Sequence, residues 1–316
     1  MAYKLIKNEK SFFYTDEYID YLSSYIGGNN CSNIIHNGEC GLVIPCIETQ
    51  YNIGSGVLSY VSLPYFEGSC FDKVKKILMN DFFKYIESFK KDIFLREDPL
   101  IKYDNIVIKT MLEYGFDVNV YYTTVIDLTQ KKEILWQNLR KSYKSLINNI
   151  INNYEVKVYG LIKEDEEDNF YLNWIELYDE VTSRANKTQS KETWEKSKIL
   201  FKNNKSFFVS VYFKNQLVAA VEIGYIKESA YYLKSAIKPE FESGISFTHA
   251  LLWKAIEEAK IIGCKSFEIG PVFFSGLSTY KASKKELNIS NFKLGMGGDL
   301  VPFHMFKYTS GENNEI

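Results

Sequence analysis

Alternating hydrophobic and polar positions divide the first half of the chain into strands and helices. Apolar runs on either side of Asn37-Gly38 predict a β-hairpin, because Asn-Gly favours the tight turn that joins antiparallel strands. Another strand is expected at 56–63. A helix is predicted over 72–90, where residues at helical spacing form one face: Val74, Leu78, Phe82, Ile86 and Phe89. The pattern continues with a strand at 92–95, a helix at 105–114 and a strand at 117–128.

The second half begins with one long predicted helix, from Thr129 to about residue 152. Its apolar stripe consists of Leu135, Leu139, Tyr143, Leu146 and Ile150. The basic residues Arg140, Lys141 and Lys144 lie off this stripe, where they contact either solvent or phosphate groups. Farther along, strands are expected at 206–213, 216–226 and 229–237, a helix over 246–262 that stops at Gly263, and a strand at 266–270.

Both halves thus contain strands, a helix and a further strand in the same order, more clearly in the second half. The repeat predicts an α+β (mixed α/β) fold with two similar units, each a mostly antiparallel sheet flanked by helices. The expected domains are residues 1–130 and residues 131–316.

Composition and charge narrow the function classes. With a net charge of −2 and a pI of about 6.1, the chain is not expected to coat nucleic acid. Its N-terminus lacks the apolar core of a signal peptide, and no apolar run approaches transmembrane length, so a soluble, cytoplasmic protein is expected. The 24 tyrosines and 22 phenylalanines supply ample core, and some rings are also suited to line a sugar or nucleobase site.

The cysteines and histidines do not predict a metal centre. The five cysteines contain no CxxC pair, and the three histidines lack helical His-x-x-x-His spacing. Neither zinc binding nor a redox dithiol is therefore expected, and the cysteines are expected to be reduced structural thiols.

Residues 285–298, with the sequence KELNISNFKLGMGG, carry the candidate chemistry. Lys293 is flanked by Phe292 and by glycines at 295, 297 and 298. A cation beside backbone that a ligand can approach closely suits an anionic group or a developing oxyanion.

This segment resembles the C-terminal signature of the FemABX-like acyltransferases, a branch of the GNAT fold whose relatives include proteins encoded with surface-polysaccharide genes. The similarity covers most of the chain and is dense after residue 170. Other matching fragments are 60–65, 182–184 with Ser190 and Trp194, Tyr231-Tyr232 and 248–253. Ser183 departs from the pattern, because glycine is usual before the position of Arg184. The resemblance implies two tandem GNAT-like units, with the transfer site in the second.

The resemblance also assigns roles within that site. In the family, the lysine that matches Lys293 lies in the transfer site, where a cation stabilises the oxyanion of the tetrahedral intermediate. Glu268 and His249 are the candidate bases. Glu222 is a weaker candidate, because its apolar neighbours Val221 and Ile223 predict that it faces solvent. The substrate-binding candidates are Phe292, Lys285, Tyr232 and Arg184.

The implied activity is transfer of an acyl or aminoacyl group to an amine of a cell-envelope or surface-glycan precursor, with no metal and no tightly bound cofactor. The donor is either aminoacyl-tRNA or acyl-coenzyme A. The stretch 238–246, where other GNAT enzymes grip pyrophosphate, has one glycine and two acidic residues, which favours aminoacyl-tRNA. The acidic overall charge favours the smaller donor.

Two alternatives remain open. One is an acyl-coenzyme A-dependent N-acetyltransferase that acts on a nucleotide-linked amino sugar. The other is an inactive GNAT-like scaffold that binds a glycan or a protein partner. The sequence does not specify the oligomeric state.

Overall fold

The computed structural model describes residues 11–54, 61–161, 167–184, 188–241, 246–276 and 280–310. The chain forms two compact units, Met1–Tyr121 with Pro302–Ile316, and Tyr122–Val301. This division differs from a single split near residue 130. The last strand, β14 (Asp299–Tyr308), pairs through Met305–Tyr308 with β7 (Asp92–Arg96), so the end of the chain returns to the first unit.

The first unit contains a three-stranded antiparallel sheet of β2 (Asn33–Asn37), β3 (Cys40–Ile44) and β6 (Tyr65–Gly68). The hairpin predicted at Asn37-Gly38 is confirmed, since Asn37 pairs with Cys40 and Gly38 takes a φ of 64° that suits glycine. The strand predicted at 56–63 falls largely outside the described residues. Within 61–63 the structure has an isolated bridge, between Ser62 and Arg96, and β6 is the third strand.

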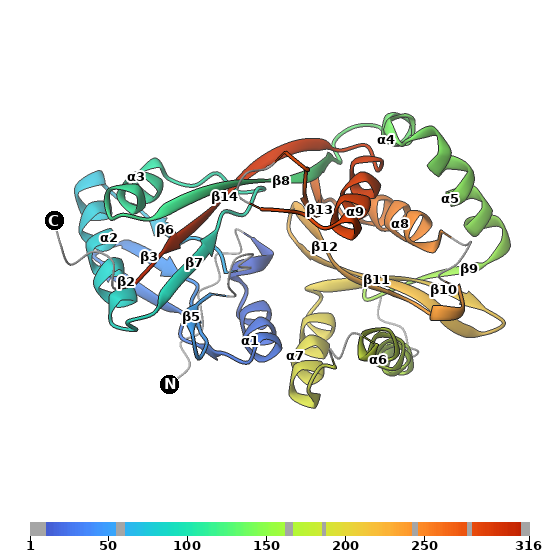
Figure 1. Cartoon of the computed structure of the whole chain (residues 1–316), viewed down its shortest axis with the longest axis horizontal. Coiled ribbons are helices and arrows are strands. Elements are labelled where there is room, and N and C mark those ends of the chain that lie inside the picture. Colours follow the sequence, from blue (N-terminus) through green and yellow to red (C-terminus); the bar gives the residue numbers. More distant parts are fainter. Residues whose placement is uncertain are drawn as a thin grey trace. The chain divides into compact units, whose positions relative to one another are not determined.

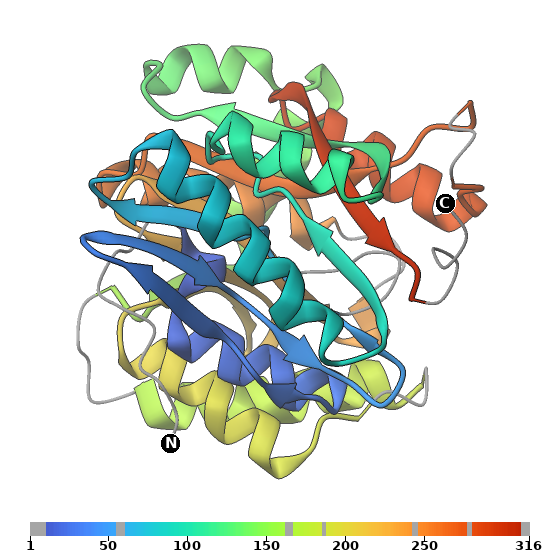
Figure 2. The same cartoon turned by 90° about the vertical axis from the view of Figure 1, so that its left-hand side faces the viewer.

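The other strands of this unit are β1 (Asn29–Asn30), β4 (Ile47–Glu48), β5 (Asn52–Ile53), β7 and β14, in the order β1-β4-β5-β7-β14. The helices are η1 (Phe12–Tyr14), α1 (Asp16–Ile26), α2 (Asp72–Glu87) and α3 (Asn105–Glu113). Figure 2 shows α2 lying across the three-stranded sheet. Leu78, Phe82 and Ile86 are buried there, as the helical spacing predicts.

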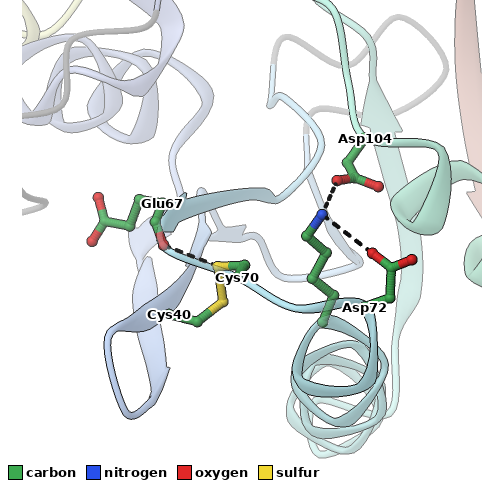
Figure 3. The surroundings of a disulfide bond; sticks show 6 residues. Cys40, Glu67, Cys70, Asp72 and Asp104 are labelled. Carbon is green, nitrogen blue, oxygen red and sulfur yellow. Dashed lines mark hydrogen bonds and ion pairs between the residues drawn. A yellow bond between two sulfur atoms is a disulfide. The ribbon is translucent and has the colours of Figure 1, made fainter.

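One pair of cysteines in this unit contradicts the expectation of reduced thiols. Cys40 and Cys70 form a disulfide, with Cα atoms 4.9 Å apart (Figure 3). The pairing follows from the sheet register: Cys40 lies opposite Gly68, so the chain beyond β6 carries Cys70 back to Cys40. Nearby, the Lys75 ammonium group joins Asp72 and Asp104, which ties the start of α2 to the start of α3.

The second unit contains the strand–helix–strand order that the sequence predicts. β10 (Ser206–Phe213), β11 (Gln216–Ile226) and β12 (Ser229–Ile237) form an antiparallel meander with the predicted boundaries. α8 (Phe247–Ile261) then leads to β13 (Ser266–Val272), which runs parallel to β12. β9 (Glu155–Tyr159) pairs with β10 at one edge, and β8 (Asp117–Asp127) pairs with β13 through Tyr122–Asp127. The mixed α/β fold class is therefore confirmed.

Helices cover both faces of this sheet (Figure 1). α4 (Lys132–Asn138), α5 (Lys141–Asn153) and α8 pack on one face around a core that includes Tyr143, Ile147, Phe247 and Phe267. α6 (Glu167–Ser183) and α7 (Lys191–Lys202) pack on the other, around Trp174, Phe201 and Phe208. In the described part of the chain, no helix combines the length and apolarity needed to cross a membrane.

The single helix predicted from Thr129 to residue 152 is wrong. Leu139 and Arg140, with ψ angles of 140° and 133°, interrupt it and separate α4 from α5. The apolar stripe continues through the break because both helices pack on the same core. The Arg140 N–H leaves the helical pattern and donates to the Gly295 carbonyl at 2.9 Å.

Candidate functional site

The segment 285–298 forms a helix and the turn that follows it. α9 (Lys284–Leu294) begins with a capping box, in which Ser283 and Glu286 each bond the other's backbone N–H. Hydrogen bonds from Tyr280 and then from Ser283 lower the pKa of Glu286. Lys293 lies in the last turn of α9, where a positive charge interacts favourably with the helix dipole.

Lys293 reaches from α9 to a bulge in β13. Its Nζ donates to the Pro271 carbonyl at 3.0 Å. Across the sheet Glu268 pairs with Val125 and Gly270 pairs with Thr124, so Ile269 is the extra residue of the bulge. Gly270 has a φ of 95°, and a Cβ placed there would lie 3.0 Å from the Lys293 Nζ. The ammonium group therefore rests against the backbone of β13, where a side chain would displace it.

The bulge lies where β13 parts from β12. The two strands pair from Ser229 and Ser266 to Tyr231 and Glu268, whereas β12 continues along β11 to Ile237. Glu268, the last residue of β13 that pairs with β12, is 3% exposed and accepts a hydrogen bond of 2.8 Å from the Thr123 hydroxyl. The buried Glu268 carboxylate thus lies where the two strands diverge. The Lys293 ammonium group contacts the same strand three residues farther along, at Pro271.

His249, in the first turn of α8, lies between two aromatic rings. Its ring centroid is 4.2 Å from that of Tyr143 and 4.8 Å from that of Phe292, both edge to face. Burial lowers the pKa of His249, and the Arg140 guanidinium group lowers it further, so the imidazole is neutral at pH 7. In the part of the chain that the structure describes, its Nδ1 is buried and has no hydrogen-bond partner. The residue is therefore held by packing, with one polar atom available.

The break between α4 and α5 fixes the end of α9. Beyond the backbone bond to Gly295, the Arg140 side chain donates to the Asn291 carbonyl and to the Tyr143 hydroxyl, both at 3.2 Å. A Cβ at Gly295 would lie 2.5 Å from the Tyr143 ring. The sequence predicted an uninterrupted helix here, with Arg140 facing solvent or phosphate, so neither its contact with α9 nor the packing of Tyr143 against Gly295 was expected.

The glycines after Lys293 have a different role from the one predicted. A Cβ at Gly297 would lie 2.7 Å from the Asn138 backbone, and one at Gly298 would lie 2.7 Å from Thr124 and Val125. These positions are filled by the protein itself, so the glycines allow α4, β8 and the end of α9 to pack closely. They are not openings for a ligand.

The remaining predicted site residues are spread over the second unit. Tyr232, on β12, packs against the same core as Phe292, and its hydroxyl lies 2.6 Å from that of Ser235. Lys285 is exposed in the first turn of α9. Arg184 is exposed just after the end of α6, a helix that packs on the opposite face of the sheet from α8 (Figure 1). The structure thus groups His249 with Phe292 and places Glu268 and Lys293 around one bulge, but it separates Arg184 from them.

Glu222 is buried, contrary to the prediction from its apolar neighbours that it faces solvent. It is 1% exposed, because α6 and α7 cover the face of the sheet that was predicted to meet solvent. Its carboxylate lies 3.1 Å from the Lys234 ammonium group on β12. That ammonium group also lies 5.0 Å, 5.2 Å and 6.0 Å from the ring centroids of Trp194, Tyr178 and Trp174. Lys234 was not among the residues predicted from the sequence.

A second bulge explains this arrangement. Lys234 pairs with Glu222 and Tyr232 pairs with Ile223, so Leu233 is an extra residue in β12. Without it, Lys234 and Tyr232 would point to the same face, because side chains alternate along a strand. The bulge turns Lys234 toward α6 and α7 at the point where β12 leaves β13. The ion pair therefore ties β12 to β11 in the part of β12 that no longer pairs with β13.

Comparisons with known proteins support this description of the fold. No family model and no curated protein matches the sequence. Among solved structures, FemX superposes with a TM-score of 0.63 at 11% identity, over 93% of this chain and 91% of FemX. The C-terminal DUF2156 domain of a protein named as a lysylphosphatidylglycerol synthetase of Agrobacterium fabrum gives 0.62 at 10% identity, over 96% of this chain and 89% of that one. L-PGS from Bacillus licheniformis gives 0.58 at 13% identity, over 95% and 93%.

Identities of 10–13% establish the fold alone. The chain therefore shares the fold of FemX, of the Agrobacterium fabrum domain and of L-PGS, in agreement with the fold that the resemblance to FemABX-like proteins predicted.

Proposed function

We propose that this protein is an acyltransferase that forms an amide, by moving an acyl or aminoacyl group to an amine of a cell-envelope or surface-glycan precursor. The observation that carries the proposal is the Lys293 ammonium group, held at the bulge of β13 where β12 and β13 diverge. The names of FemX and the lysylphosphatidylglycerol synthetases support the same class of reaction. We place the reaction in the cytoplasm, where activated acyl donors are available.

In this proposal the donor ester or thioester lies against the unpaired edges of β12 and β13. When the amine attacks its carbonyl carbon, negative charge develops on the carbonyl oxygen. A fixed ammonium group stabilises that charge without having to reorganise during the reaction. The acyl bond to the donor then breaks, and the donor oxygen or sulfur leaves with the proton that balances its charge.

The acceptor's ammonium group must lose a proton before its nitrogen can attack, and two side chains are candidates to take that proton. Glu268 offers a buried carboxylate on β13 that accepts a hydrogen bond from the Thr123 hydroxyl. His249 offers a neutral imidazole, because burial lowers its pKa. Glu268→Gln and His249→Gln, compared in kcat/KM across pH, separate these roles: only loss of the true base removes the acidic limb of the profile. We assign Phe292, Tyr232 and Lys285 to substrate contact, and we assign no such role to Arg184, which is exposed after the end of α6.

The donor is tested by thermal shift. We propose aminoacyl-tRNA, because the stretch 238–246 lacks the glycine-rich pyrophosphate loop of other GNAT enzymes; residues 242–245 of it lie outside the described residues. Coenzyme A should then leave Tm nearly unchanged, whereas a tightly bound donor stabilises by mass action, about 2.7 kcal/mol at 100 times its Kd. A clear rise in Tm with acetyl-coenzyme A would favour the acyl-coenzyme A alternative instead.

The reaction itself is tested by mass spectrometry. Purified protein is incubated with charged tRNA or acyl-coenzyme A and with amino-sugar nucleotides, peptidoglycan precursors or phosphatidylglycerol vesicles. The proposal expects an amide product on an amine acceptor, formed by the wild type and strongly reduced in Lys293→Ala. An ester on the lipid would contradict the amine acceptor. Turnover of none of these donors, with tight binding of a glycan, would support an inactive scaffold.

A further inference from the structure

Two cysteines of the first unit, apart from the disulfide Cys40–Cys70, face each other. Cys31 lies between β1 and β2, and Cys46 lies between β3 and β4. Their sulfur atoms are 3.0 Å apart, which exceeds the length of a disulfide bond by about 1 Å. Cys46 is 1% exposed, whereas Cys31 is half-buried and can be reached from solvent.

Backbone hydrogen bonds hold the two cysteines in this position. The Cys31 N–H donates to the Cys46 carbonyl at 3.0 Å, and the Cys46 N–H donates to the Ser32 hydroxyl at 2.9 Å. On the other side, the Tyr85 hydroxyl of α2 donates to the Cys31 carbonyl. The two segments are therefore already aligned, and joining the sulfur atoms needs a small adjustment of the side chains.

The two thiols are chemically unequal. The hydrogen bond between the sulfur atoms lowers the pKa of Cys31 and, together with burial, raises the pKa of Cys46. Cys31 therefore ionises first, and it is also the more exposed of the two. A nucleophilic, accessible thiolate with a second, buried thiol next to it is the arrangement that thiol–disulfide exchange requires.

We propose that Cys31 and Cys46 form a redox-active dithiol that exchanges with low-molecular-weight disulfides of the glutathione class. The Cys31 thiolate attacks one sulfur of the disulfide, which forms a mixed disulfide and releases one thiolate. Cys46 then gives up its proton and attacks the Cys31 sulfur, which closes the Cys31–Cys46 bond and releases the second thiolate. The two electrons lost by the cysteine pair reduce the small disulfide to two thiols. This inference does not depend on the proposed acyl transfer.

The test incubates the folded full-length protein with glutathione at several ratios of disulfide to thiol. Free thiols are then blocked, and the chain is unfolded and digested after glutamate. Cleavage at Glu39, Glu48 and Glu67 separates Cys31 from the peptide with Cys40 and Cys46, and both from Cys70. Oxidised wild type should yield these three peptides joined together. Cys46→Ser should instead release the Cys31 peptide carrying one glutathione, because the resolving thiol is absent.

Two comparisons keep the test specific. Cys31→Ser should leave Cys46 unmodified, since the buried thiol is the resolving one. Cys264, a buried thiol of the second unit whose pKa burial raises to about 12, is the control within the same sample and should stay free. The proposal is overturned if the wild-type Cys31 peptide stays separate and unmodified while Cys40–Cys70 is closed. It is equally overturned if, in Cys46→Ser, Cys31 gains glutathione no faster than Cys264.

Discussion

The buried ion pair of Lys234 and Glu222 allows a prediction whose size follows from the structure. Their side chains are only 10% and 1% exposed, so water can hardly solvate either charge. Replacing Lys234 by Met leaves a buried carboxylate without its cation. Breaking a buried pair in this way costs about 3–5 kcal/mol. Glu222→Gln should cost less, because the three aromatic rings still hold the Lys234 cation, each contact contributing up to about 2 kcal/mol when desolvated.

Urea unfolding followed by tryptophan fluorescence is a suitable assay. All four tryptophans, Trp136, Trp174, Trp194 and Trp253, belong to the second unit, so the signal reports the unit that contains the pair. The matched control is Lys196→Met. Lys196 pairs with Glu192 along α7 at 2.7 Å, a shorter distance than that of the buried pair, but at the surface. Its loss should cost about 0.3–0.5 kcal/mol.

Two further results make the reasoning testable. The destabilisation of Lys234→Met should shrink as the pH is lowered, because the uncompensated carboxylate then takes up a proton. The double variant Lys234→Met with Glu222→Leu should recover most of the loss, since an apolar pair of similar volume carries no buried charge. If Lys234→Met and Lys196→Met lose the same stability, burial does not govern the pair and the reasoning is refuted.

Other predictions concern the residues around α9. Because burial lowers the pKa of His249, NMR titration should find it below the ordinary value of about 6.5. The folded chain then binds that proton less tightly than the unfolded chain, so the free energy of unfolding should fall as pH drops below about 6.5. The fall should be less steep in His249→Gln, and equal slopes of stability against pH in the two proteins would contradict this. In the same urea assay, Gly295→Ala should lower the free energy of unfolding by about 1–3 kcal/mol, because the new Cβ clashes with Tyr143. The control Gly276→Ala should be nearly neutral, because a Cβ there meets nothing within 4 Å. Equal losses at both glycines would show that the close packing at Gly295 is not limiting.

The second meander was predictable because its three strands are separated by short polar turns. The predicted boundaries of β10, β11 and β12 match the structure, since long apolar runs and turns are local signals. The break at Leu139 and Arg140 was not predictable in this way. The apolar stripe passes through it without interruption, and its stabilising bond joins Arg140 to Gly295, far along the chain.

The candidate site shows the same division between local and distant causes. Lys293 was recognised from its sequence context, but its contact with Pro271 depends on a bulge that shifts the register of β13. Glu222 was expected in solvent because alternation indicates two faces without telling which of them is covered. Here helices cover both faces, as α6 and α7 bury the side that carries Glu222. Likewise, the Cys40–Cys70 disulfide follows from a strand pairing that cysteine spacing does not reveal.

The role of Lys293 in acyl transfer is tested most directly by the steady-state kinetics of Lys293→Ala with the donor and acceptor found by mass spectrometry. If Lys293 stabilises the oxyanion, kcat should fall by about 10²–10³, and KM should change less, because the lost interaction forms mainly in the transition state. Lys293→Arg should restore part of the rate, since the planar guanidinium group places its charge differently. Lys284→Ala, an exposed lysine of the same helix, is the control and should keep wild-type kcat. Full activity of a folded Lys293→Ala on those substrates would contradict the proposed mechanism.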